Sequence, residues 1–181
     1  IGAFCLSEPE AGSDATSQKT SAIDKGDYYL LNGTKNWITN GGRSDVYLVI
    51  AQTDKDKGSH GINAFIVEKG MEGLDAPKIE GKFSLRASIT GGIAMDEVFV
   101  PEENRLPEAT SLKAPFMCLN SARYGISWGV MGAAEACWHA ALTYVTERHV
   151  YGKALGGHQL VQKKLADMQT EITLGLCAAH R

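Results

Sequence analysis

The segment 6–14, Leu-Ser-Glu-Pro-Glu-Ala-Gly-Ser-Asp, contains several groups that could bind a ligand. Pro9 and Gly12 predict a turn. Ser7 and Ser13 place hydroxyl groups around that turn. Such a loop presents hydroxyls and backbone N–H groups to an anion or to the polar edge of a heterocycle. Taken alone, the segment is more simply interpreted as an ordinary polar loop that binds nothing.

A second candidate segment, 36–40, reads Asn-Trp-Ile-Thr-Asn. Alternate residues of a strand point to the same side, so Trp37 and Thr39 are predicted to share a face. A flat aromatic ring beside a hydroxyl donor suits a planar ligand ring with polar atoms on its edge. Core packing is the simpler interpretation of Trp37 taken alone.

The elements that must position these residues change character along the chain. Residues 1–108 are predicted to form a β domain, with strands at 28–31, 37–39, 46–51, 62–67 and 98–100. Asn32-Gly33 predicts a hairpin turn between the first two of these strands. Short strands at this spacing favour a small barrel or sandwich.

Residues 109–181 are predicted to be helical. One helix is expected over about 115–150 and a second over about 159–180, joined by a turn at 151–157. The second helix carries an apolar stripe: Leu160, Val161, Leu165, Met168, Ile172 and Leu176. The fold class is therefore α+β, a β-barrel domain at 1–108 followed by the first helices of a bundle at 109–181.

Composition excludes several classes of function. The chain has 181 residues, a net charge of -3 and no run of basic residues, so nucleic acid is not an expected partner. No stretch approaches roughly 18 consecutive apolar residues, so no membrane span is expected. The five histidines show no metal-ligand spacing, and no metal site is predicted. Four scattered cysteines, without a CxxC pair, are interpreted as buried thiols of a reducing compartment.

The motifs Phe4–Pro9 with Ala11–Asp14, and Asn32–Lys35 with Trp37–Asn40, together resemble the acyl-CoA dehydrogenase flavoprotein family. The resemblance extends over all 181 residues. In the segments 81–91 and 115–125 it is closest to the glutaryl-CoA dehydrogenase branch. It implies that the chain carries the middle β-barrel domain, which binds FAD and acyl-CoA, and the start of the C-terminal helical bundle.

The resemblance also implies roles for individual residues. The FAD contacts would be Phe4, Cys5, Leu6, Ser7, Gly12, Ser13, Trp37, Ile38, Thr39, Arg148 and Gln159. The acyl-CoA contacts would be Ser13, Phe116, Leu119, Asn120 and Arg123. Trp37 would cover one flavin face, Thr39 would bond near the reactive nitrogen, and Arg148 and Gln159 would reach the FAD of a neighbouring subunit. The chain departs from the family at Ser7, often Thr, at Tyr151, usually Phe, and at Ala154, usually Pro.

No residue of this chain is assigned as the catalytic base. Removing a proton next to a thioester needs a positioned carboxylate. In most of the family this Glu lies near the C-terminus, beyond residue 181. A few members place it at the position that is Ala122 here, and Glu135 and Glu147 match neither place. We therefore expect the chain to be a fragment, inactive alone, of a longer enzyme.

The resemblance favours oxidative decarboxylation of glutaryl-CoA to crotonyl-CoA, a step of lysine and tryptophan degradation. Electrons would pass to an electron-transferring flavoprotein, and the full-length enzyme would be a homotetramer. It would be cytoplasmic in a bacterium or lie in the mitochondrial matrix of a eukaryote. Two alternatives stay open: a dehydrogenase of monocarboxylic short-chain acyl-CoA, and a non-catalytic partner subunit that binds FAD or CoA.

Overall fold

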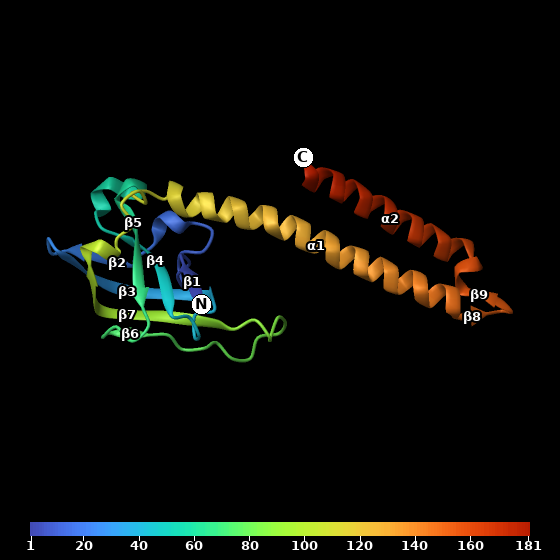
Figure 1. Ribbon diagram of the computed structural model, residues 1–181, viewed down its shortest axis with the longest axis horizontal. Helices are drawn as coiled ribbons and strands as arrows, with labels where there is room; N and C mark the ends of the chain where they lie inside the picture. The colour runs from blue at the N-terminus through green and yellow to red at the C-terminus, as the bar shows by residue number, and fades with distance from the viewer. The chain divides into compact units, whose positions relative to one another are not determined.

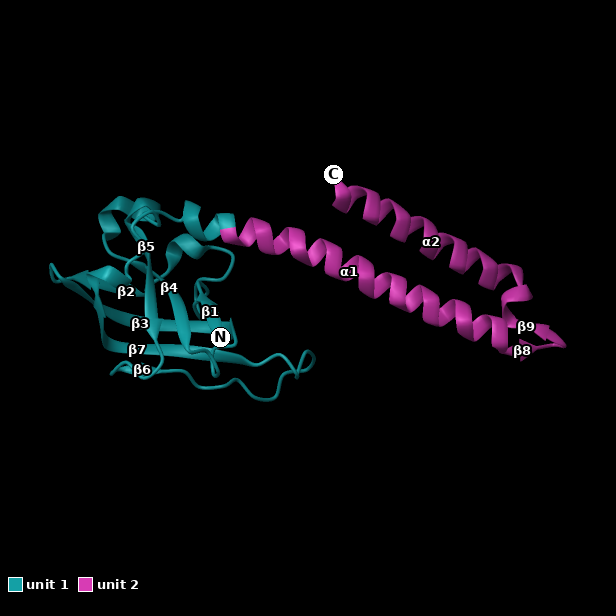
Figure 2. Cartoon of the chain, viewed as in Figure 1, with its two compact units in different colours: residues 1–117 teal, residues 118–181 magenta.

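The computed structural model describes residues 1–181 and divides the chain into two compact units. The first unit comprises residues 1–117 and the second residues 118–181 (Figure 2). The first contains the sheet, and the second contains most of a long helix, a small hairpin and a second helix. The predicted α+β class is confirmed.

The first unit is built on a seven-stranded sheet that curls into a half-barrel (Figure 1). Its strands are β1 (Gly2–Cys5), β2 (Ser21–Asp24), β3 (Tyr28–Thr39), β4 (Val46–Gln52), β5 (Ile62–Glu68), β6 (Leu74–Asp75) and β7 (Thr90–Pro101). The order is β1-β4-β2-β3-β7-β6, with β5 paired to β4. β1 runs parallel to β4, and the long β3 and β7 are antiparallel. The predicted strands at 46–51 and 62–67 are confirmed.

The core of this unit lies on the inner side of the curled sheet. It is made of alternate side chains of the strands, among them Leu31, Val49, Phe65, Val67 and Val98. The ring of Tyr29 packs edge-on against Phe65, with 4.9 Å between the ring centroids. Two short 3-10 helices, Ala15–Ser17 and Lys55–Gly61, lie between strands, and a third, Glu102–Asn104, follows β7.

The hairpin predicted at Asn32-Gly33 is wrong. β3 continues through both residues, and its pairing with β7 shifts register between Leu31 and Gly33. The Asn32 side-chain oxygen accepts a hydrogen bond of 2.9 Å from the backbone N–H of Glu97 across this bulge. Asn32-Gly33 therefore forms a β-bulge. Like a tight turn, this bulge uses a residue with positive φ and an amide side chain that accepts a backbone hydrogen bond.

Replacing Gly33 with alanine is expected to lower the free energy of unfolding by about 1–3 kcal/mol. Gly33 has φ of 145°, and an added Cβ would lie 2.6 Å from the Thr20 hydroxyl oxygen and 2.7 Å from the Thr20 Cα. Gly26→Ala is the matched control, since Gly26 also has positive φ but no atom within 4 Å of the added Cβ. Urea titration would compare the two, and equal losses would contradict a role for the Thr20 contact.

The second unit pairs two antiparallel helices through a tight hairpin. Helix α1 (Lys113–Glu147) begins within the first unit, and α2 (Gln159–His180) follows the strands β8 (His149–Val150) and β9 (Lys153–Ala154). A 3-10 turn, Leu155–Gly157, leads into α2. The turn residues Tyr151 and Gly152 both have positive φ, 53° and 79°, as a type I′ hairpin requires. Both predicted helices are confirmed.

The apolar stripe of α2 packs on α1 within the second unit. Of its six predicted members, Val161, Leu165, Met168, Ile172 and Leu176 are at least half-buried. Leu160 is the exception, 78% exposed. The indole N–H of Trp138 on α1 donates to the Leu165 carbonyl at 3.1 Å. At Gly175 an added Cβ would lie 2.4 Å from the sulfur of Met131, so a glycine allows this close approach.

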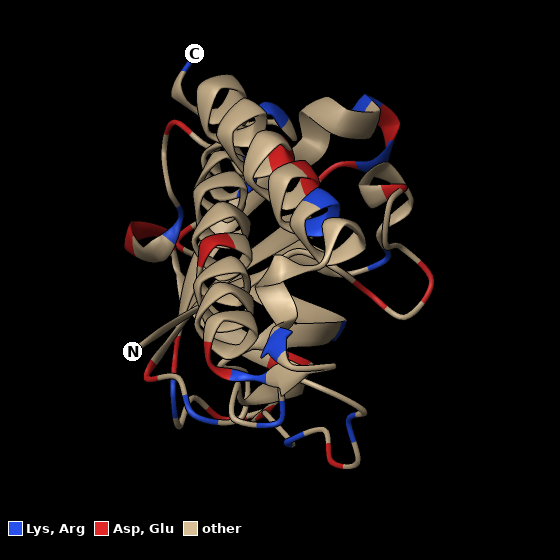
Figure 3. Cartoon of the chain, turned by 90° about the vertical axis from the view of Figure 1, so that its right-hand side faces the viewer, with Lys and Arg blue, Asp and Glu red and all other residues tan.

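No helix is long and apolar enough to cross a membrane. Acidic and basic residues are interspersed along loops and helices of both units (Figure 3). This interspersion agrees with the small net charge of -3.

Candidate functional site

The two candidate segments of the first unit lie side by side. The backbone N–H of Asn36 donates a hydrogen bond of 2.9 Å to the carbonyl of Ser7. The loop that follows β1 is thereby attached to the second half of β3. Residues that are thirty positions apart in the sequence are adjacent, which is what a shared ligand site requires.

Trp37 and Thr39 both lie on the exposed side of β3 and flank the buried Ile38. Core packing of Trp37 is therefore ruled out, since its side chain is 63% exposed. The pairing with β7 shifts register between Lys35 and Ile38, and Trp37 has φ of 58°. A positive φ is uncommon for a bulky residue, so a second bulge sets the direction of this indole.

The other candidate residues of the two segments divide into those with buried side chains and those with partly or fully exposed ones. The side chains of Cys5, Leu6 and Ile38 are buried, so these residues could meet a ligand only through their backbone. Phe4 and Ser7 are half-buried, and Gly12 and Ser13 are exposed. A Cβ added at Gly12 would meet no atom within 4 Å, so nothing inside the chain requires a glycine there.

A buried ion pair lies beneath this loop, and the sequence analysis gave neither of its residues a role. Lys35 Nζ lies 2.8 Å from Glu8 Oε1, and both side chains are almost completely buried. Burial raises the pKa of the Glu8 carboxyl, but hydrogen bonds from Lys35, Thr20 and Lys19 outweigh it and hold that pKa below its ordinary value. Strand alternation could have predicted that Lys35 is buried, because it places Lys35 on the same inward face as Tyr29 and Leu31.

The cysteines were predicted to be buried, and for three of them this is wrong. Cys118, Cys137 and Cys177 are exposed on the two helices, and only Cys5 is buried. A helix paired with a single neighbour leaves most of its surface uncovered, which sequence composition does not reveal.

We expect the Cys5 thiol of the native chain to resist labelling at pH 8. Burial raises its pKa to about 12, against an opposing effect of the Lys35 charge, so almost none of it is thiolate at that pH. A disulfide reagent followed by mass spectrometry should label the three helical cysteines rapidly and Cys5 only after denaturation. Rapid labelling of all four thiols would contradict this.

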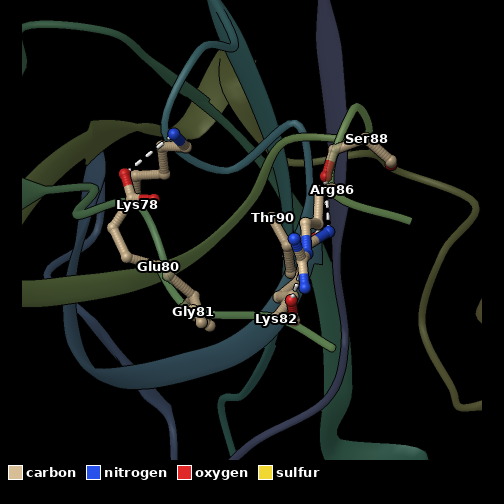
Figure 4. A pocket seen from close by; sticks show the side chains of 8 residues that line it. Lys78, Glu80, Gly81, Lys82, Arg86, Ser88 and Thr90 are labelled. Carbon is tan, nitrogen blue, oxygen red and sulfur yellow. Dashed lines mark hydrogen bonds and ion pairs between the residues drawn. The ribbon is translucent and has the colours of Figure 1, made fainter. Parts of the chain in front are cut away.

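A pocket of about 250 Å³ lies beside the end of β3, because Thr39 pairs with Thr90 of β7 and Thr90 lines the pocket. Its lining is Lys78, Ile79, Glu80, Gly81, Lys82, Arg86, Ser88 and Thr90 (Figure 4). Lys82 Nζ donates to the carbonyls of Leu85 and Ser88 and to the Thr90 hydroxyl, at 2.9, 2.5 and 2.9 Å. The ammonium thus orders the loop 82–90. In the sequence, the segment 81–91 is notable only for its resemblance to the glutaryl-CoA dehydrogenase branch.

The remaining candidates lie on α1 and around the hairpin. Phe116 is exposed and Leu119 is half-buried. Arg123 donates to the Asn120 side-chain oxygen at 2.9 Å, one helical turn away. The side chains of Arg148 and Gln159 are exposed next to the β8–β9 hairpin, as is Tyr151 at its tip. Ala122, Glu135 and Glu147 are also exposed.

No three His, Cys, Asp or Glu residues are placed so that they could hold a metal ion. The arrangement of the first unit is instead that of a surface for a planar ligand. It combines an exposed indole, an exposed threonine two residues further on, and a neighbouring loop that carries a half-buried serine.

Comparison with known protein families identifies both units. A profile described as the acyl-CoA dehydrogenase middle domain matches residues 3–98, more than half of the chain. A profile described as the acyl-CoA dehydrogenase C-terminal domain matches residues 113–181. The chain belongs to the acyl-CoA dehydrogenase family. Members of this family are FAD-dependent oxidoreductases.

The individual relatives are named for different acyl-CoA substrates. A short-chain specific acyl-CoA dehydrogenase of Megasphaera elsdenii is 44% identical over 174 residues, 95% of this chain. A glutaryl-CoA dehydrogenase of Desulfococcus multivorans is 38% identical over 183 residues, and subunit CarC of the caffeyl-CoA reductase-Etf complex of Acetobacterium woodii is 40% identical over 171. The chain spans 45–47% of the length of these three relatives.

Solved structures agree with this fold. Two crystal structures of glutaryl-CoA dehydrogenase from Mycobacterium smegmatis, one of them in complex with FADH2, are 46% and 43% identical to this chain. Each matches 99% of this chain and 45% of the crystal chain, with a TM-score of 0.93. The predicted family is confirmed, and its similar members include both glutaryl-CoA and short-chain acyl-CoA dehydrogenases.

Proposed function

We propose that the full-length protein containing this chain is an FAD-dependent acyl-CoA dehydrogenase. The observation that carries the proposal is the attachment of the Ser7 loop to β3 beside the exposed Trp37 and Thr39. Residues 1–108 serve as the middle β domain and residues 109–181 as the start of the C-terminal helical bundle. Within the family, bound FAD supplies the acceptor for the hydride that leaves the β carbon of the thioester.

The residues of the first unit fit this cofactor. The open space above Gly12 admits a ligand at a position where no contact within the chain demands glycine. Trp37 would cover one face of the flavin ring, while the Thr39 and Ser7 hydroxyls and nearby backbone amides would bond its polar edge. Phe4, Cys5, Leu6 and Ile38 would contribute through their backbone, and Ser13 would contact the pyrophosphate.

Arg148 and Gln159 complete the cofactor site of another subunit. Both side chains are exposed beside the hairpin of the second unit, which leaves them free to reach a ligand on a neighbouring molecule. The planar guanidinium of Arg148 suits the FAD pyrophosphate, which it can bond through two parallel N–H groups. This arrangement requires an oligomer, and we propose a homotetramer.

Glutaryl-CoA is the substrate we favour. The support is the 46% identity to a glutaryl-CoA dehydrogenase structure over 99% of this chain. Ser13, Phe116, Leu119, Asn120 and Arg123 would contact the acyl-CoA, and oxidation followed by decarboxylation would give crotonyl-CoA in lysine and tryptophan degradation. A monocarboxylic short-chain acyl-CoA is the second candidate, favoured by the 44% identity to the Megasphaera elsdenii enzyme.

An electron-transferring flavoprotein is the proposed electron acceptor. The relative CarC is named as a subunit of a complex with Etf, which supports this class of partner. A non-catalytic subunit that only binds FAD or CoA is a further alternative, because this chain supplies no carboxylate that we assign as the base.

Anaerobic titration of the purified full-length protein with glutaryl-CoA would test the proposal. We expect the visible flavin band to bleach while carbon dioxide is released. Bleaching only with butyryl-CoA would contradict glutaryl-CoA as the substrate and support a monocarboxylic short-chain acyl-CoA. Bound FAD that no acyl-CoA bleaches would overturn the dehydrogenase and favour the non-catalytic subunit.

A further inference from the structure

The buried pair Glu8–Lys35 belongs to a closed polar network. The ammonium of Lys35 donates to Glu8 Oε1, to the Leu6 carbonyl and to the Gln18 side-chain oxygen, at 2.8, 3.0 and 3.1 Å. An ammonium has three N–H donors, so all of them are used. The Glu8 carboxylate also accepts the backbone N–H groups of Lys19 and Thr20, at 2.6 and 3.0 Å.

Such a pair is not what a core needs for stability. Two charges lose their hydration on burial, and replacing both by apolar residues of similar volume is often neutral or stabilising. Lys35 is 0% exposed, and Leu31 and Ile38 of the same strand belong to the apolar core. A network with every donor and acceptor satisfied instead specifies one arrangement of the backbone groups that it binds.

The backbone that this network binds is the loop on either side of Ser7. Lys35 holds the carbonyl of Leu6 and the side chain of Glu8, the two neighbours of Ser7. The next residue of β3, Asn36, holds the carbonyl of Ser7 itself. Three consecutive loop residues are therefore bonded to two consecutive strand residues, directly before the bulge that orients Trp37.

We propose that Glu8 and Lys35 are positioning residues that fix Ser7 relative to Trp37 and Thr39 in the FAD site. Neither side chain is placed to touch the ligand, because both are buried beneath the loop. They act by holding the serine hydroxyl and the loop amides at the polar edge of the flavin, while Trp37 covers one face of the same ring. This inference rests on the proposed function and assigns these two residues their role in it.

The test replaces the whole pair in the full-length protein with Glu8→Leu and Lys35→Met together. The double variant leaves no unpaired buried charge, so it is expected to fold. We expect its FAD dissociation constant to rise at least about ten-fold, the loss of roughly one well-placed hydrogen bond to the ligand. We also expect its flavin absorption band to shift, because that band depends on the groups around the flavin and would not change if only the stability of the protein changed.

The chain offers a matched control in the same loop. Lys19 and Glu10 form an exposed side-chain ion pair, so Glu10→Leu with Lys19→Met makes the same chemical changes while the backbone N–H of Lys19 can still donate to Glu8. This control should bind FAD within about two-fold of the wild type. Circular dichroism would check that both double variants are folded.

A double-mutant cycle with Ser7→Ala decides whether the pair acts through Ser7. In the wild-type background Ser7→Ala should weaken FAD binding, and in the paired variant it should have almost no further effect, because the serine is already misplaced. Independent, additive effects would overturn the inference, as would wild-type FAD affinity in the paired variant. If the wild-type protein bound no FAD, the proposed function would fall and the inference with it.

Discussion

Replacing Lys35 alone with methionine should lower the free energy of unfolding by about 3–5 kcal/mol. The substitution leaves the Glu8 carboxylate buried, with its pairing charge removed and only two backbone N–H groups as partners. The carbonyl of Leu6 and the Gln18 oxygen lose their common donor as well. An unpaired charge in a low-dielectric interior is among the most costly defects of a core.

Urea titration would measure this loss on the unit that contains the sheet, with Lys19→Met as the control. Lys19 pairs with Glu10 in solvent, so its loss should leave the unfolding free energy almost unchanged. Adding Glu8→Leu to Lys35→Met should restore most of the lost stability, because it removes the stranded charge. A single variant as stable as the wild type would show that the carboxylate is not held charged in the core.

The second large effect is expected at Arg148. Replacing it with alanine in the full-length protein should weaken FAD binding by about 10–100-fold, the usual value of a hydrogen bond to a charged group. Arg148→Lys keeps the charge but loses the planar fork of donors, so an intermediate loss is expected. Fluorescence titration of the apoprotein with FAD would give the three dissociation constants.

Lys153→Met provides the control for Arg148 because it removes a positive charge from the same hairpin. Its ammonium donates to the Gly157 carbonyl at 3.3 Å, and no ligand role is proposed for it. FAD affinity should stay within about two-fold of the wild type. Equal losses in Arg148→Ala and Lys153→Met would indicate a general effect of charge or of the hairpin fold, and would contradict pyrophosphate binding.

The class of fold and the two segments of the candidate site follow from local features of the sequence. Strands at 46–51 and 62–67 and helices near 115–150 and 159–180 carry strong periodic patterns of apolar residues, and such patterns depend on local structure alone. The family motifs at 4–14 and 32–40 are local as well, so they could be read without knowing how the chain folds.

Features that depend on residues distant in the sequence could not be predicted and are visible only in the folded chain. Asn32-Gly33 is compatible with a turn or a bulge, and the pairing of β3 with β7 selected the bulge. Trp37 could be core or surface until a second bulge placed it outside. The Glu8–Lys35 pair joins residues 27 positions apart, and only the packing of the loop on β3 makes a lysine inside this sheet stable.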